Sequence, residues 1–479
     1  MASLTKRTAI LIICRTTNYG VQLLSPLFLV RILDVHAYGQ YREFVLYAMI
    51  AASIITFSIP TSLIYFMPKF PQRERQGVTH SALFLLTTSL AGILVIFLGR
   101  DLIRSRTSYD FVYPLMMYVF FFVNLDFFES YALGKKRAFA VLLYSTTRIA
   151  ARIVSIVVTA YITHDIMAVL KVMIAVEIVK CVLLAFIFRR HFTKSLDAAL
   201  AREQLRFIVP LGSAEVIRYC NSELSKVVIS VTMGVESLAL YTIGSYQIPV
   251  INIIRSSVID VIFPDMTLAC DRDRLRLWQR ANVVFCFMII PIFAVFMYHA
   301  RTVIDVLFTS QYLAAVPLFR IYLAMMLMQC FEMGTPLRAM NENRYFVLGS
   351  IISLAIDIGI IFALFRIVGF LIPAIAVIAG ESAVLWYLGR KILRLYSVKL
   401  GGLLMWRKIF AIAASCLAAC PLLFAGELLP LNAVGRAVVS SCVYLAAYML
   451  IVRRLKIDEV DLMVARAGDG VRRILSLRT

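Results

Sequence analysis

Residues 205–231 of the chain are LRFIVPLGSAEVIRYCNSELSKVVISV. This stretch is long and apolar enough to cross a bilayer as a helix. Yet its part 207–231 carries five strongly polar side chains: Glu215, Arg218, Asn221, Glu223 and Lys226. At 100° per residue the four charges fall within an arc of roughly 140°. A charge near the bilayer centre costs roughly 3 kcal/mol on insertion scales, so such a face needs a polar partner or a water-filled cavity.

The composition of the whole chain is that of a polytopic α-helical membrane protein. Of its 479 residues, 61% are hydrophobic and only 16% are charged, whereas about 25% is usual for soluble proteins. The mean hydropathy is +0.85. The apolar runs are continuous rather than alternating, which excludes a β-barrel. Residues 8–32 are too long for the apolar part of a signal peptide and lack a small-residue cleavage site, so we expect them to form the first membrane helix.

The pattern of apolar runs predicts about 14 transmembrane helices. They are expected at 8–32, 43–67, 78–98, 111–133, 141–161, 167–188, 207–231, 238–263, 281–299, 313–333, 345–366, 370–389, 407–425 and 434–452. Longer connections at 189–206 and 390–406 divide the chain. We therefore expect an N-lobe of six helices (1–200), a C-lobe of six helices (201–400), and a C-terminal helix pair with a cytoplasmic tail (401–479).

Basic residues orient the predicted helices. Most of the 49 lysines and arginines lie in the loops on the side of the N-terminus and in the C-terminal tail. The opposite loops hold only Arg42, Arg100, Arg104, Arg106, Arg301 and Arg366. This asymmetry predicts that both termini are cytoplasmic. It also accounts for most of the net charge of +21 without a nucleic-acid partner.

The two lobes resemble distant copies of one another. Val35 and Tyr41 follow the first helix, and Val235 and Tyr241 follow the seventh at an offset of 200 residues. Because six helices form each unit, the copies have the same orientation in the membrane. We expect two pseudo-symmetric bundles that bind substrate between them and alternate access.

Further charges lie inside the predicted spans, and they suggest a cationic cavity for an anionic substrate. The candidates for substrate binding are Arg15, Arg148, Arg152, Arg218, Asn221, Lys226 and Arg255. Arginine suits phosphate because its planar fork binds two oxygens at once. Glu215 and Arg218, Glu223 and Lys226, and Glu177 and Lys180 could instead pair within their helices. Arg148 and Arg152 share a helix face and repel, so they need an outside anion, either a protein carboxylate or a substrate phosphate.

Acidic residues within the spans are candidates for carrying a coupling proton or sodium ion. They are Glu215, Glu223, Asp260, Asp357 and Glu381. Pairing with an arginine of a neighbouring helix is the alternative for Asp357 and Glu381. The sequence has no Walker-type phosphate-binding loop, no GxSxG and no HExxH motif. The nine cysteines and five histidines show no metal-ligand spacing. We therefore expect no enzyme activity, catalytic residues, metal or cofactor, and transport that runs downhill or on an ion gradient.

Three short motifs resemble those of the Wzx-type polysaccharide and O-antigen flippases, in the multidrug/oligosaccharidyl-lipid/polysaccharide exporter superfamily. They are Arg31-Ile-Leu-Asp-Val-His-Ala-Tyr-Gly-Gln-Tyr41, Gly134-Lys-Lys-Arg137 and Asn341-Glu-Asn-Arg-Tyr-Phe346. The resemblance covers essentially the whole chain. It implies transport of an undecaprenyl-pyrophosphate-linked oligosaccharide across the bacterial inner membrane, for O-antigen, exopolysaccharide or capsule synthesis. Its implied partners are membrane lipids, a polysaccharide polymerase and a chain-length regulator.

Three other functions are consistent with the same sequence features. A lipid II flippase would share the fourteen spans and the basic residues of the first and eighth helices. A cation-coupled multidrug antiporter would be expected to carry an acidic residue in the first helix, where this chain has Arg15. A membrane scaffold of a glycan assembly complex would use the intramembrane charges only for structure.

Overall fold

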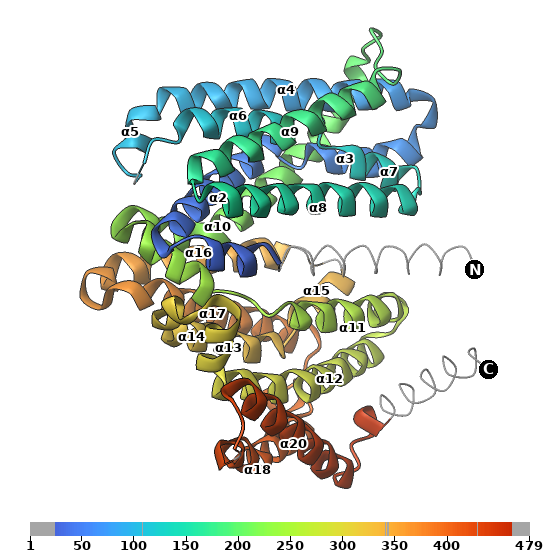
Figure 1. Ribbon diagram of the computed structural model, residues 1–479. Helices are drawn as coiled ribbons and strands as arrows, with labels where there is room; N and C mark the ends of the chain where they lie inside the picture. The colour runs from blue at the N-terminus through green and yellow to red at the C-terminus, as the bar shows by residue number, and fades with distance from the viewer. Residues whose placement is uncertain (1–23, 108, 341, 343, 429, 462–479) are drawn as a thin grey trace, which may run out of the picture. The chain divides into compact units, whose positions relative to one another are not determined.

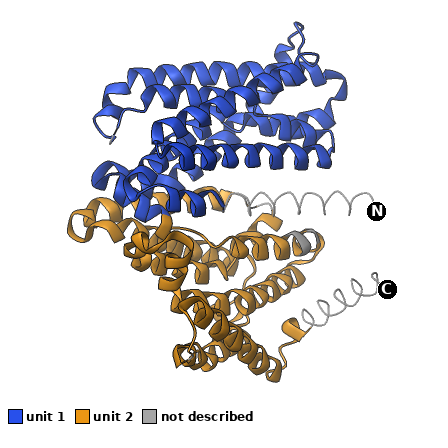
Figure 2. Ribbon diagram, in the orientation of Figure 1, with its two compact units in different colours: residues 1–242 blue, residues 243–479 orange. Residues whose placement is uncertain are grey.

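The computed structural model describes residues 24–107, 109–340, 342, 344–428 and 430–461, without the side chains of residues 260, 261 and 264 (Figure 1). The described residues form helices and the turns that join them, as predicted. They divide into two compact units, residues 1–242 and 243–479 (Figure 2). The predicted division at residue 200, which rests on the longer connection at 189–206, stays a prediction.

The first unit contains nine helices among the described residues after residue 34. They are α2 (Val35–Thr56), α3 (Ile59–Lys69), α4 (Glu74–Leu98), α5 (Arg100–Arg104), α6 (Val112–Val123), α7 (Phe128–Gly134), α8 (Ala138–Thr163), α9 (Ile166–Phe188) and α10 (Ala198–Gly244). Helix α9 packs against both α6 and α8, and α2 packs against α4 and α6. These contacts place α6, α8 and α9 around the intramembrane charges of this unit.

The second unit contains the remaining α-helices. They are α11 (Pro249–Leu268), α12 (Asp271–Tyr298), α13 (Ala300–Phe308), α14 (Val316–Gln329), α15 (Gly334–Ala339), α16 (Arg344–Val368), α17 (Ile372–Leu395), α18 (Trp406–Ala419), α19 (Pro421–Ala425) and α20 (Ala433–Arg454). Helices α16 and α17 pack closely against each other, and α12 contacts α11, α14 and α18. Helix α18 also packs against α20, so the C-terminal helix pair is joined to the unit through α12.

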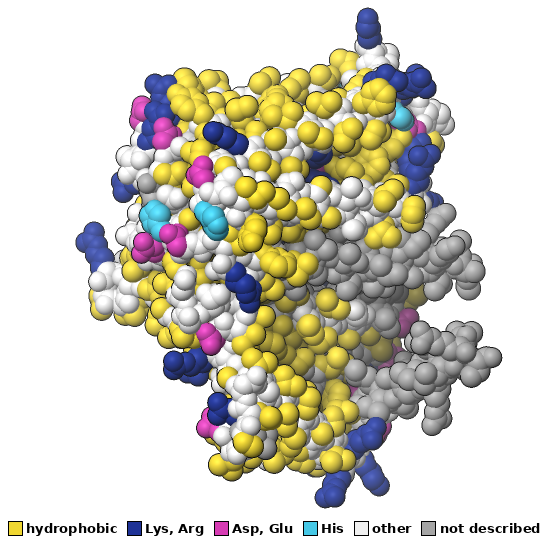
Figure 3. All heavy atoms as spheres, viewed as in Figure 1, with side chains coloured by type: hydrophobic (Ala, Val, Ile, Leu, Met, Phe, Trp, Pro, Cys, Tyr) yellow, Lys and Arg dark blue, Asp and Glu magenta, His cyan; other side chains and the backbone are white. Residues whose placement is uncertain are grey.

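Ten stretches of the described chain are long and apolar enough to cross a membrane. Apolar side chains are spread widely over the face seen in Figure 3. Some apolar side chains of the described residues are largely exposed, such as Leu98 (72%) and Phe362 (84%). Lipid contact accounts for exposed apolar side chains on this scale, because water would not tolerate so large an apolar surface. The described chain therefore has the all-α membrane fold that the sequence predicts.

The difference between ten stretches and the fourteen predicted spans has four local causes. The span 8–32 lies mostly outside the described residues. Helix α9 carries Lys171, Glu177 and Lys180 and is too charged to be counted. Helices α16 and α17 are counted together as one stretch, Arg344–Leu395. The predicted span 238–263 is not one helix, because α10 continues to Gly244 and α11 begins at Pro249. The number fourteen thus stays a prediction.

Helical geometry is interrupted at two positions that are 200 residues apart. Asp34 has extended backbone angles (φ −69°, ψ 172°), and its side chain caps α2 by accepting a hydrogen bond from the Ala37 N–H. Gly234 interrupts α10 with φ 80° and ψ −178°, a combination that is essentially restricted to glycine. Tyr41 and Tyr241, which follow the two breaks at equal distances, are both buried. The two breaks have the spacing of the predicted duplication.

The two segments that follow these breaks contact each other within the first unit. A Cβ atom at Gly39 would lie 2.2 Å from the Val235 carbonyl oxygen, so only glycine allows α2 to approach α10 this closely. The Ser230 hydroxyl donates a hydrogen bond of 2.6 Å to the buried Glu43 carboxylate. Glu43 was not among the candidates from sequence, although a glutamate at the start of an apolar span is the signal that could have identified it.

Substitution of Gly39 by alanine is expected to destabilise the protein by about 1–3 kcal/mol, because the methyl group forces α2 away from the α10 backbone. The measurement is thermal unfolding of the purified protein. Gly359→Ala is the matched control, because a Cβ at Gly359 meets no atom within 4 Å. Equal unfolding temperatures for the two variants would show that the α2–α10 contact does not limit stability.

Candidate functional site

A helix break within the membrane positions the first functional side chain. The predicted span 111–133 is interrupted after α6, where Asn124 leaves the helix and Leu125 has a positive φ of 60°. The Asn124 amide donates hydrogen bonds to the Ser89 hydroxyl (2.9 Å) and to the Phe120 carbonyl (2.8 Å). Irregular backbone at membrane depth is tolerated where it is buried in protein or lines a cavity. The break turns Asp126 towards α8.

Asp126 neutralises Arg148 of α8. The guanidinium donates two hydrogen bonds to the carboxylate, Nη1 to Oδ1 at 2.6 Å and Nη2 to Oδ2 at 3.2 Å. The pair is mostly buried, with 18% and 24% of the two side chains exposed. Of the two anions that the sequence leaves open for Arg148, the structure therefore supplies the protein carboxylate.

Arg152, one helical turn further along α8, has a different environment. Its guanidinium lies over two aromatic rings, 5.6 Å from the Tyr118 ring centroid and 5.7 Å from that of Phe122. Within the described residues no carboxylate lies within ion-pair distance of Arg152. The nearby Tyr118 hydroxyl is buried and has no hydrogen-bond partner among the described residues. Arg152 is thus held by ring faces, and its charge is not neutralised by a direct ion pair.

A third cation approaches the same aromatic ring from α9. Lys180 lies 5.3 Å from the Phe122 ring centroid, forms an ion pair of 2.9 Å with Glu177, and donates a hydrogen bond of 2.6 Å to the Phe122 carbonyl. That carbonyl is near the C-terminus of α6, where a cation is favoured. We call this group the Phe122 cluster: Phe122, Asp126, Arg148, Arg152, Glu177 and Lys180. Its three cations and two carboxylates leave one positive charge in excess.

The charges of α10, which were the most conspicuous in the sequence, pair within the helix. Arg218 contacts Glu215 at 2.5 Å and Lys226 contacts Glu223 at 2.8 Å. Arg218 is also 64% exposed. Asn221 is half-buried between the two pairs, and its side-chain oxygen has no hydrogen-bond partner among the described residues. Both pairs leave little net charge on α10, whereas the Phe122 cluster contains one more cation than carboxylates.

In the second unit, Arg255 of α11 forms an ion pair with Glu332. Glu332 lies in a break between α14 and α15, as Asp126 lies in the break between α6 and α7. Each unit thus has an interrupted helix whose acidic residue neutralises an arginine. Arg15 and the side chain of Asp260 lie outside the described residues.

Asp357 of α16 is a buried acid with an unusual environment. It is 3% exposed, and its Oδ1 atom has no hydrogen-bond partner among the described residues. A Cβ atom at Gly380 of α17 would lie 2.5 Å from Oδ1 and 2.8 Å from the Ser353 hydroxyl. Gly380 therefore allows α17 to pack directly against the acid. Glu381 follows in α17, is exposed, and forms no ion pair with a described residue.

Solved structures with a similar fold are membrane transporters. The lipid II flippase MurJ in an inward closed conformation matches with a TM-score of 0.73 at 12% identity, over 94% of this chain and 100% of that chain. A multidrug resistance MATE family transporter of the MOP superfamily, in an inward-facing conformation, matches with a TM-score of 0.59 at 14% identity, over 79% and 94%. A MOP superfamily transporter from Pyrococcus furiosus, described as having a binding pocket of reverse polarity, matches with a TM-score of 0.57 at 12% identity, over 82% and 95%.

Together the helices and these likenesses define a multi-pass membrane protein with the fold of the MOP superfamily transporters. Residues 28–317 also match the family described as "Polysaccharide biosynthesis protein". The chain belongs to this family, which confirms the resemblance found in the sequence. No curated protein matches the chain in sequence.

Proposed function

We propose that this protein is a flippase that moves an undecaprenyl-pyrophosphate-linked oligosaccharide across the bacterial inner membrane by alternating access. It would supply the synthesis of O-antigen, exopolysaccharide or capsule, with membrane lipids, a polymerase and a chain-length regulator as partners. The family concerns polysaccharide biosynthesis, and MurJ, with a similar fold, is a lipid II flippase. The observation that carries the proposal concerns Arg152, a cation in a predicted membrane span. Among the described residues, no carboxylate forms an ion pair with it.

Arg152 is arranged to bind a phosphate oxygen. A guanidinium that lies over aromatic rings keeps its N–H groups in its own plane, where they can donate to an anion. The surrounding ion pairs hold Arg148 and Lys180 in place. Their two positive charges are balanced by the two carboxylates of the cluster, so the charge in excess is that of Arg152 itself. Pyrophosphate presents several negatively charged oxygens and would replace the missing carboxylate.

The remaining candidates extend this proposal. Arg15, Arg218, Asn221, Lys226 and Arg255 are proposed as further contacts to the glycan or to the phosphates. The ion pairs of Arg218, Lys226 and Arg255 would have to exchange partners when substrate binds, so Arg152 is the stronger candidate. Glu215 and Glu223 are engaged in pairs within α10. Asp357, Glu381 and Asp260 therefore remain the candidates for ion coupling.

The alternative functions predict different charge arrangements in the Phe122 cluster. A cationic drug would be repelled by its excess positive charge, which disfavours a multidrug antiporter. In a scaffold, the buried charges would be expected to be fully paired, as Arg148 is and Arg152 is not. A lipid II flippase would also need a pyrophosphate site and has to be separated by experiment.

The test of the function uses reconstituted protein and the producing strain. Proteoliposomes should move a fluorescent undecaprenyl-pyrophosphate oligosaccharide to the opposite leaflet, and empty liposomes should not. Loss of the gene should remove the surface polysaccharide without lysis. Lysis would indicate lipid II as the substrate, and an intact coat together with no translocation would indicate a scaffold.

Replacement of Asp357 by asparagine is expected to abolish the acceleration of translocation by a proton or sodium gradient, because asparagine keeps the shape of the side chain but cannot bind a proton or supply a carboxylate. The measurement compares translocation with and without each gradient in proteoliposomes. Asp305→Asn, an exposed acid of α13, is the control. A full gradient response in Asp357→Asn would assign the coupling to another acid.

A further inference from the structure

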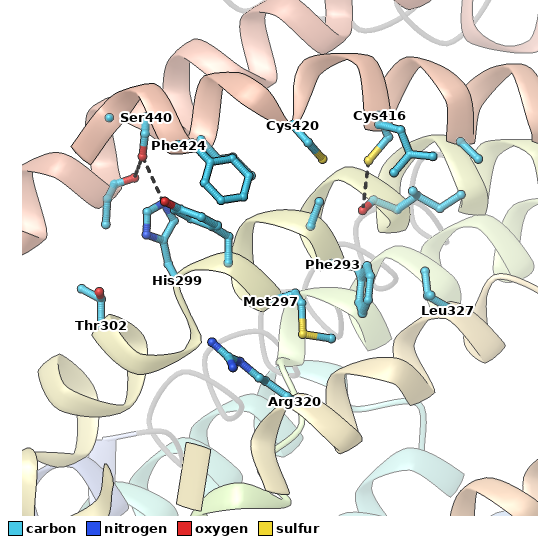
Figure 4. Close-up of a pocket in the computed structure, with 18 of the residues that line it drawn as sticks. Phe293, Met297, His299, Thr302, Arg320, Leu327, Cys416, Cys420, Phe424 and Ser440 are labelled. Atoms are coloured by element: carbon cyan, nitrogen blue, oxygen red, sulfur yellow. Dashed lines mark hydrogen bonds between the residues drawn. The ribbon is translucent and has the colours of Figure 1, made fainter. Parts of the chain in front are cut away.

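A large cavity lies within the second unit. It measures about 1080 Å³ and is enclosed by helices α12, α13, α14, α18, α19 and α20 (Figure 4). Most of its wall is apolar and includes Phe293, Met297, Phe410, Leu417 and Phe424. Its volume is at the upper end of the range of small-molecule pockets, about 300–1,000 Å³.

The cavity is open to the lipid-facing surface. Three of its lining side chains are largely exposed: Leu417 (71%), Phe410 (65%) and Phe424 (60%). They belong to α18 and α19, within a stretch that is apolar enough to span the membrane. An apolar molecule can therefore enter from the surrounding bilayer without crossing water.

One end of the cavity is cationic. Arg301 at the start of α13, Arg320 in the second turn of α14 and Arg436 in the first turn of α20 all line it. Figure 4 shows the guanidinium of Arg320 extending from α14 towards the end of the cavity where Thr302 and His299 lie. Within the described chain none of the three arginines forms an ion pair. This part of the wall was missed in the sequence analysis, although Arg320 and Arg436 are charges inside predicted spans.

Four other polar groups at this end are engaged with one another. The Tyr298 hydroxyl donates a hydrogen bond of 2.5 Å to Glu427, and a hydrogen bond of 3.0 Å joins His299 Nε2 and the Ser440 hydroxyl. Glu427 is the one acidic residue in the described wall. Three arginines and one glutamate leave two positive charges in excess, so this end of the cavity is complementary to an anion.

We propose that this cavity binds a membrane glycerophospholipid with an anionic head group, such as phosphatidylglycerol. The acyl chains occupy the apolar part between α12 and α18, and the phosphate lies among Arg301, Arg320 and Arg436. A net negative charge matches the excess of arginines, which a zwitterionic head group does not neutralise. The bilayer also supplies glycerophospholipid at high local concentration, so mass action favours this occupant. The proposal is independent of the transported substrate.

The test measures lipid that stays bound to the full-length protein through purification. Lipids are extracted from the purified protein and identified by mass spectrometry, and binding is then titrated in detergent with phosphatidylglycerol, phosphatidylethanolamine and undecaprenyl phosphate. We expect phosphatidylglycerol to be retained and to bind about tenfold more tightly than phosphatidylethanolamine, because the arginines repel the ammonium group of the latter while both lipids offer the same phosphate. Equal binding of the two phospholipids, or tighter binding of undecaprenyl phosphate, would overturn the proposal.

Three variants locate the site. Arg320→Gln with Arg436→Gln should lower the affinity for phosphatidylglycerol about tenfold. Arg366→Gln, which removes an exposed arginine of α16 outside the cavity, should leave it unchanged. Ala413→Trp fills the apolar part of the cavity and should also displace the lipid. This variant tests the site even if the protein with both Arg320→Gln and Arg436→Gln does not fold. The lipid would have to bind elsewhere if Ala413→Trp retained as much phosphatidylglycerol as the unaltered protein. The same would follow if Arg366→Gln lowered the affinity as much as the two cavity substitutions together.

Discussion

Replacement of Arg152 by glutamine is expected to slow oligosaccharide translocation by about tenfold to a hundredfold while the protein stays inserted and stable. Hydrogen bonds to a charged group contribute about 1.5–3 kcal/mol, and each 1.4 kcal/mol corresponds to a factor of ten. Glutamine retains a hydrogen-bond donor but loses the charge and the planar fork. Stability should be retained because Arg152 has no ion pair to break among the described residues, and the repulsion from Arg148 is removed.

The measurement is the rate of translocation of a fluorescent pyrophosphate-linked oligosaccharide in proteoliposomes at equal protein density. Lys171→Gln is the matched control, because it removes a cation from the neighbouring helix α9 at an exposed position. A hydrophobic cation should show the opposite trend and bind no worse to Arg152→Gln than to the unaltered protein. Equal slowing in both variants would indicate a general effect of charge and would argue against a phosphate contact at Arg152.

Replacement of Asp126 by asparagine is expected to destabilise the protein by about 3 kcal/mol, the lower end of the range for breaking a buried ion pair. Arg148 would keep its charge in a mostly buried position without the carboxylate that now accepts two hydrogen bonds from it. The effect is measured as the change in thermal or denaturant-induced unfolding of the purified protein in detergent.

A second substitution and a control separate charge from shape. Asp126→Asn combined with Arg148→Met should recover most of the lost stability, because no uncompensated charge remains. Glu215→Gln breaks an ion pair whose side chains are 46% and 64% exposed, so it should cost at most about 1 kcal/mol. If the double variant were no more stable than Asp126→Asn, the loss would have to come from the α6–α7 break and not from the buried charge.

The sequence predicted the helices more reliably than the breaks within them. Residues 111–133 were expected to be one span, and Val112–Gly134 is one stretch apolar enough to cross the membrane, but within it the chain leaves helical geometry at Asn124 and forms α6 and α7. A hydropathy pattern averages over such a break, because the flanking residues stay apolar. The break is what turns Asp126 towards Arg148, so a hydropathy pattern that does not show the break does not show the main ion pair of the site either.

The pairing of charges shows most clearly what periodicity can and cannot specify. The partners in α10 are three residues apart, and their helical spacing alone was enough to suggest the pairs that the structure contains. Arg148 and Asp126 are 22 residues apart, and Arg255 and Glu332 are 77 apart. A helical period assigns a side chain to a face of its own helix but does not identify the helix opposite that face.

The sequence by itself thus determined that this is an all-α membrane protein with charges inside its spans, and its motifs indicated the polysaccharide family. These properties follow from the cost of exposing backbone and charge to lipid, which each segment meets separately. Only the tertiary structure decided which charges are neutralised. In the opening stretch, Arg218 has a partner on its own helix, whereas Arg152 is left to the faces of Tyr118 and Phe122. The physical reason is that an ion pair depends on which helices pack together, and packing is a property of the whole bundle.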